Sequence, residues 1–206
     1  MIMTLIGLWA AGVSGMGQGQ IGFLNTSSTL IATNSTPGGP SMGPISGPMG
    51  NYFFGLFIAP PGTTDPAAFT FTGLYGTNLT TAGRFSGGTP EVPGAPPDSL
   101  RSFLVRAWSA NIGHDYSAVV DYLANPTFPV AYGESRIGTI QLGRGDPFPT
   151  PILFGVNPGQ ISGFTLEMYP VPEPSSVMVG VAAGLLWGFR MKKPAKALDD
   201  LRHRER

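Results

Sequence analysis

The chain of 206 residues has no cysteine and only two histidines. The missing cysteines exclude disulfide bonds, thiolate metal sites and cysteine nucleophiles. His114 is the single histidine between residues 18 and 170, so a metal site built from several histidines is excluded there as well. The acidic residues show no calcium-loop spacing. We therefore expect neither a metal nor a cofactor.

Charge is also scarce, because Asp, Glu, Lys and Arg together make up only 12% of the sequence. Residues 18–170 contain no lysine, and their five arginines stand against eight acidic residues, which gives a net charge of −3. The other seven cations all lie in residues 190–206. A body without a basic patch does not attract a phosphate backbone, so nucleic-acid binding is not expected.

Glycine, proline and aromatic residues are abundant instead, with 30 Gly, 21 Pro and 13 Phe. This mixture favours short strands separated by turns over long helices, and it supplies enough large apolar side chains for a core. Residues 31–51 hold five Gly and four Pro, which predicts a loop or an extended edge.

Apolar runs bounded by turn residues predict five strands, over 52–59, 69–75, 102–110, 135–143 and 161–169. In the third strand, Phe103, Val105 and Ala107 share one face, whereas Leu104, Arg106 and Trp108 share the other. Asp115 can cap a short helix over 116–123, which Asn125 and Pro126 end. The pattern predicts a mainly β body, an antiparallel β-sandwich or jelly roll with one short helix.

Residues able to carry out chemistry are few in this body. Adjacent residues on one backbone cannot generally serve as base and orienting group, so His114 and Asp115 favour a turn and a cap over a catalytic dyad. No catalytic residue is predicted. Arg106 and Trp108 could form a glycan-stacking platform if Trp108 is exposed, although a strand tryptophan is more often covered.

The N-terminal segment has the order of a secretory signal. Residues 2–13 are apolar apart from Thr4 and two glycines, and small residues follow, which indicates a signal peptide over 1–17. No Lys or Arg precedes the run, and a start upstream of Met1 would account for that departure.

The C-terminal segment reads YPVPEPSSVMVGVAAGLLWGFRMKKP over residues 169–194. Pro172 and Pro174 cannot continue a helix backwards, so a transmembrane helix is predicted over 175–189. The cations Arg190, Lys192 and Lys193 over 190–193 orient it, because cations remain on the cytoplasmic side. Three glycines spaced four apart would form a helix-packing face, or reflect ordinary small-residue usage in membrane helices; they are Gly180, Gly184 and Gly188.

Taken together, the 171–174 tetrapeptide, the apolar run and the basic cluster resemble the PEP-CTERM sorting signal of exported bacterial proteins. The resemblance covers residues 171–193 and implies that Pro172, Glu173 and Pro174 are recognised by an exosortase, a membrane-embedded protease that removes the tail. Members usually end soon after the basic cluster, whereas this chain continues with a polar tail over 194–206. The resemblance also implies an association with exopolysaccharide matrix.

These features predict an exported protein, held briefly in the inner membrane and then sorted to the cell surface or matrix. The 18–170 body is expected to have a structural or adhesive, non-catalytic role. One alternative is a glycan-binding module of the matrix, which requires an exposed Trp108 beside Arg106. Another is an envelope glycan hydrolase, which requires two carboxylates about 5–10 Å apart in a cleft.

Overall fold

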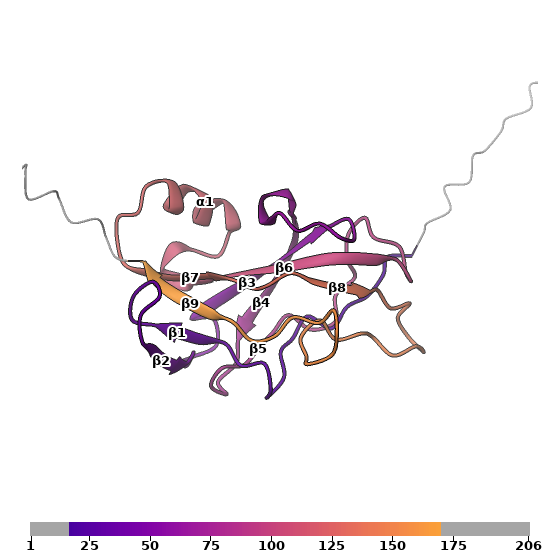
Figure 1. Ribbon diagram of the computed structural model, residues 1–206, viewed down its shortest axis with the longest axis horizontal. Coiled ribbons are helices and arrows are strands. Elements are labelled where there is room, and N and C mark those ends of the chain that lie inside the picture. The colour runs from indigo at the N-terminus through magenta and orange to yellow at the C-terminus, as the bar shows by residue number, and fades with distance from the viewer. Residues whose placement is uncertain (1–16, 170–206) are drawn as a thin grey trace, which may run out of the picture. The chain divides into compact units, whose positions relative to one another are not determined.

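The computed structural model describes residues 17–169 (Figure 1). The predictions for the signal peptide up to residue 16, the sorting signal over 171–193 and the tail over 194–206 lie outside these residues.

Within residues 17–169, nine strands form the framework, with one α-helix and two short 3₁₀ helices between them. The strands are β1 (Ala32–Asn34), β2 (Ser41–Pro44), β3 (Tyr52–Ala59), β4 (Thr70–Asn78), β5 (Phe85–Ser86), β6 (Leu100–Ser109), β7 (Val130–Glu134), β8 (Gly138–Gln141) and β9 (Thr165–Tyr169). The helices are η1 (Pro66–Ala68), η2 (Ala110–Ile112) and α1 (Tyr116–Ala124).

All nine strands join one curled sheet with the order β2-β1-β9-β7-β6-β3-β4-β5, and β8 pairs with the first part of β6. The mainly β fold with one short helix is thus confirmed. The structure differs from the expected pair of packed sheets because its strands form a single hydrogen-bonded sheet. Its pairing is antiparallel except between β1 and β9, which run parallel.

Most predicted strands coincide with observed ones, and β3 has the predicted bounds. The Gly/Pro-rich segment 31–51 contains β1 and β2 at one end of the sheet, in agreement with the expected extended edge. Strand β7 was not predicted. Its sequence VAYGE follows Pro129 and includes Gly133, and both residue types argue against a strand in a linear pattern.

The centre of the sheet is the pair β3 and β6, which are in antiparallel register from Tyr52↔Ser109 to Ala59↔Ser102. One side of this pair carries the largest apolar cluster, which includes Phe54, Leu56, Phe103, Val105 and Ala107. We call this side the loop face, because it is covered mostly by extended segments outside the regular strands, which supply buried side chains such as Phe23, Leu153 and Phe154. Isolated bridges, for example Gln20↔Gly143 and Leu24↔Ser86, hold these segments together.

The opposite side of the sheet, the helix face, lies against α1 and the segment around η1. Its core consists of two smaller clusters built around Phe57 and Leu104, and around Trp108 and Tyr132. The alternation predicted for 102–110 is confirmed, since Leu104 and Trp108 belong to these clusters, whereas Phe103 and Val105 belong to the loop face.

Candidate functional site

Most of the sequence-predicted site residues lie outside the described part of the chain. This applies to the processing motif, the basic cluster and the three spaced glycines. Arg106 and Trp108 are within it, on the helix face of β6. The structure therefore bears on the glycan platform but not on the sorting motif.

Trp108 is fully buried, with no exposed surface. Its indole is surrounded by Phe53, Tyr75 and Tyr116, with ring centroids about 6 Å away, and its Nε1–H donates to the carbonyl of Gly113 at 2.9 Å. The glycan platform, which required an exposed Trp108, is therefore contradicted, and the covered tryptophan that was the alternative is observed. The physical reason is that α1 and η2 cover this end of the helix face, so the indole serves as core with its one polar atom satisfied.

Arg106 is nearly buried as well, because only 13% of its side chain is exposed. Its Nε–H donates to Glu134 Oε1 at 2.8 Å, and its two terminal nitrogens donate to the Tyr116 hydroxyl and to the Pro66 carbonyl. The guanidinium carbon lies 4.5 Å from the ring centroid of Phe57. Arg106 thus joins β6, β7, α1 and η1, which makes it a structural anchor of the helix face.

The same network includes Tyr132, whose hydroxyl donates to Glu134 Oε1 at 2.8 Å. Burial, followed by the neighbouring Glu134 carboxylate, raises the pKa of Tyr132 well above its ordinary value. Glu134 therefore accepts hydrogen bonds from both an arginine and a tyrosine. The Glu134 Oε1 atom is therefore part of the hydrogen-bond network that joins β6 and β7.

His114 and Asp115 contact each other, with Nδ1 and Oδ1 3.0 Å apart, and both side chains are more than half exposed. The imidazole packs against the rings of Tyr75 and Phe53. Asp115 is at the N-cap position of α1, as predicted, but its side chain forms no capping hydrogen bond. The pair therefore lies in a surface turn, as predicted, whereas the predicted side-chain cap is not formed.

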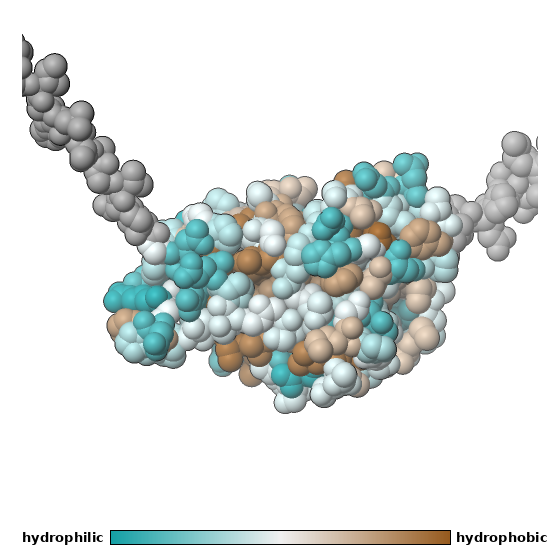
Figure 2. All heavy atoms as spheres, turned by 180° about the vertical axis from the view of Figure 1, so that it is seen from behind, coloured by the Kyte–Doolittle hydropathy of each residue, from teal (hydrophilic) through white to brown (hydrophobic). Residues whose placement is uncertain are grey.

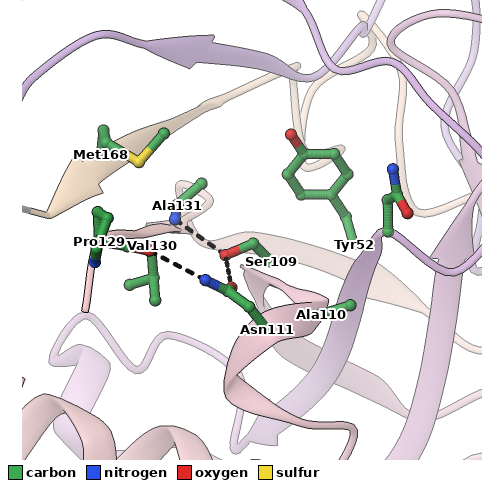
Figure 3. Close-up of a pocket in the computed structure, with 9 residues that line it drawn as sticks. Tyr52, Ser109, Ala110, Asn111, Pro129, Val130, Ala131 and Met168 are labelled. Carbon is green, nitrogen blue, oxygen red and sulfur yellow. Dashed lines mark hydrogen bonds between the residues drawn. The ribbon is translucent and has the colours of Figure 1, made fainter. Parts of the chain in front are cut away.

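A shallow groove of ≈ 310 Å³ opens where β3 and β7 begin and where β6 and β9 end (Figure 3). The sequence gives no sign of this groove, because its lining residues come from four separated segments. Its lining is uncharged and comprises Asn51, Tyr52, Ser109, Ala110, Asn111, Pro129, Val130, Ala131 and Met168.

Internal hydrogen bonds fix the floor of this groove. Ser109 Oγ accepts from the Ala131 N–H at 3.0 Å and donates to Asn111 Oδ1, while Asn111 Nδ2 donates to the Pro129 carbonyl at 3.0 Å. Figure 3 shows Tyr52 and Met168 on opposite sides of this chain of polar groups. The groove thus presents an aromatic ring, an amide and a thioether on a rigid floor, with no carboxylate for hydrolysis.

Residues 17–169 were also compared with the requirements of a metal site and of a membrane span. No three side chains of the His, Asp and Glu types in this range gather closely enough to hold a metal ion. In the same range, no helix combines the length and the apolar composition that crossing a bilayer would need. On the face shown in Figure 2, apolar residues form several small separate areas among polar ones.

Comparison of the chain with protein-family models, with curated proteins and with solved structures finds no match.

Proposed function

We propose that this chain is an exported bacterial surface or matrix protein whose body has a structural or adhesive, non-catalytic role. A C-terminal helix holds it briefly in the inner membrane until an exosortase-type protease acts at Pro172, Glu173 and Pro174. One observation carries the proposal: the motif, the thirteen uncharged residues 177–189 and the basic cluster follow one another in that order.

The way the body ends supports this proposal. Strand β9 ends at Tyr169, only three residues before Pro172, and it is hydrogen-bonded to β1 on one side and to β7 on the other. A C-terminal strand paired on both sides keeps the body folded up to the start of the motif. A protease working at the membrane would then find the motif in a short connector directly after a stable sheet.

Charge distribution supports the proposed orientation. Residues 18–170 have a net charge of −3 and no lysine, whereas residues 190–206 hold seven cations. Cations next to a spanning helix remain on the cytoplasmic side. The body then lies outside the inner membrane, and the signal peptide over 1–17 would direct its export.

The test is to fractionate the native bacterium and to determine the mature termini by mass spectrometry. We expect a protein that has lost its N-terminal segment and its tail beyond the motif, in the surface or matrix fraction. Glu173→Ala should cause the unprocessed form to accumulate in the inner membrane. A full-length protein that still carries Arg206 in the cytosol would overturn the proposal.

A glycan-binding role is a second candidate, now based on the groove rather than on Trp108. The groove offers one half-buried aromatic ring, Tyr52, next to neutral amide and hydroxyl groups, which suits a neutral saccharide with apolar faces and many hydroxyls. Tyr52→Ala and Asn51→Ala would be compared with the wild-type protein on an array of neutral and acidic oligosaccharides. Binding of neutral glycans that both variants weaken supports this role, and absence of binding by the wild type contradicts it.

A further inference from the structure

We infer that the end of the body formed by Val120, Leu123, Phe128 and Tyr169 lies against the lipid surface while the protein is anchored. The inference depends on the proposed function, because it requires residues 175–189 to span the membrane. The inference assigns an interaction surface to the body. The partner of that surface is the outer leaflet of the membrane that holds the anchor.

The connector between the body and the predicted membrane helix is short. Only five residues, 170–174, separate Tyr169 from the predicted start of the membrane helix at Ser175. A fully extended chain covers about 3.3–3.6 Å per residue, so the connector spans about 20 Å at most. A folded body of roughly 150 residues has a radius of gyration of about 15 Å. Tyr169 can therefore lie no more than about 20 Å from the start of the predicted membrane helix.

Tyr169, Phe128 and the C-terminal half of α1 lie at the same end of the body. Tyr169 pairs with Val130 at the start of β7, and its ring lies against Tyr132. Phe128 precedes β7 by two residues and is fixed to α1, because its ring packs on Tyr122 and its carbonyl accepts the Tyr122 hydroxyl. The C-terminal half of α1 is thus fixed to the segment that leads into β7, at the same end of the sheet as Tyr169 (Figure 1).

The large side chains exposed at this end are aliphatic or aromatic. Val120 is 50% exposed, Leu123 and Phe128 are 37% exposed, and Tyr169 is 36% exposed. The eighteen residues 116–133 contain one charged residue, Asp121. Aromatic and aliphatic side chains with few charges around them are the kind that enter the interfacial layer of a bilayer.

The opposite end of the body provides the contrast. It also exposes apolar side chains, among them Phe148 and Val156 at 53% and 79%. Phe148 lies against Arg144, whose guanidinium carbon is 5.5 Å from the ring centroid, and Arg144 pairs with Asp98 at 2.5 Å. Strand β6 runs from this end to the Tyr169 end over ten residues, about 30 Å at strand geometry. When the Tyr169 end lies against the membrane, Val156 is therefore at the end of the body away from the lipid.

The test uses the absence of cysteine from the sequence. Leu123→Cys, Phe128→Cys and Val156→Cys each introduce one thiol at an exposed position of the full chain, to be labelled with an environment-sensitive fluorophore. The proteins are reconstituted into vesicles of phosphatidylethanolamine and phosphatidylglycerol, and alkaline extraction checks that the chain is integrated. Thermal unfolding of each labelled variant is compared with that of the wild type. If the variant at Leu123 or at Phe128 does not fold, Val120→Cys is used in its place.

We expect blue-shifted emission and quenching by spin-labelled lipids for the labels at Leu123 and Phe128, and a water-like spectrum for the label at Val156. An integrated protein in which all three labels give the same spectrum overturns the inference and leaves the proposed anchor intact. A chain that alkaline treatment extracts from the vesicles overturns the proposed anchor, and the inference with it.

Discussion

The two faces of the central sheet differ in the kinds of side chain that pack on them, although the same two strands, β3 and β6, contribute to both. On the loop face, Phe54, Leu56, Phe103 and Val105 meet other apolar side chains, and no charged residue belongs to the cluster. On the helix face, Trp108 and Phe57 pack beside a charged pair, Arg106 and Glu134, which two tyrosines complete. The helix face therefore includes an ion pair in its hydrogen-bond network, whereas the buried polar side chain beside the loop-face cluster, Asn25, is neutral and bonds backbone groups of Thr29, Gly83 and Phe85.

This difference has a consequence for tolerance to substitution. An apolar cluster accepts other apolar side chains of similar volume at a cost usually below about 1.5 kcal/mol. A buried polar network loses more when one member is removed, because the remaining members are left without partners. The two faces should respond differently to equally conservative changes.

The largest expected effect is truncation of the central aromatic side chain on each face. Phe54→Ala and Trp108→Ala should each lower the free energy of unfolding by about 3–5 kcal/mol, because both side chains are fully buried. Urea unfolding followed by circular dichroism measures the change. Phe54→Leu and Trp108→Phe then separate the faces, since only the second leaves the Gly113 carbonyl without its donor. Equal losses for these two milder variants would contradict the comparison.

The next effect concerns the ion pair on the helix face. Arg106→Met should cost about 1–3 kcal/mol, because Glu134 and the Tyr116 hydroxyl lose a donor in a largely buried position. The double variant Arg106→Met with Glu134→Gln should be less destabilised than the sum of the two single variants, with a coupling of about 0.5–3 kcal/mol. Denaturant unfolding of all four proteins gives this coupling, and strict additivity would show that the pair contributes only as two independent side chains.

A smaller effect should appear at high pH. The pKa of Tyr132 is higher in the folded protein than in the unfolded chain, owing mainly to burial and then to Glu134. Its stabilising contribution is therefore complete below about pH 10, the ordinary tyrosine pKa, and is lost as the pH rises above that value. Urea unfolding at a series of pH values from 9 to about 11 should give a steeper decline for the wild type than for Tyr132→Phe. Parallel declines would argue against a shifted Tyr132.

The smallest effect is expected at the start of α1. Asp115→Ala should change stability by less than about 0.5 kcal/mol, because the Asp115 carboxylate contacts His114 instead of capping the helix. Asp65 is the matched control, since its Oδ1 accepts from the Ala67 N–H at 2.9 Å, and Asp65→Ala should cost about 0.5–1 kcal/mol. A larger loss at Asp115 than at Asp65 would show that the helix cap forms in solution.

Several elements could be predicted because their information is local. The run 52–59 is apolar on both faces, which requires a central strand, and β3 has those bounds. The alternation in 102–110 assigns Arg106 and Trp108 to one face of β6, as observed. The helix after Asp115 was predicted to within one residue at its C-terminal end. The proposed sorting motif also depends on local information, because three consecutive residues and a hydropathy pattern define it, and it remains a prediction.

Other features could not be predicted because they depend on contacts between distant segments. Trp108 is buried because η2 and α1, which follow it in sequence, fold back over its strand. Strand β7 exists because β6 and β9 pair with it on either side, despite Pro129 and Gly133. Similarly, Ser109 and Met168 meet at the groove only because β9 returns beside β7.

The sequence by itself determined the β-rich composition, the alternation of the central strands and the order of the C-terminal motif, since each is a property of neighbouring residues. Only the tertiary structure decided that the strands form one continuous sheet, that Arg106 is an internal anchor, and that Phe128 and Leu123 share an end with Tyr169. These outcomes follow from pairing between segments far apart in the chain, and side-chain burial depends on what those segments cover.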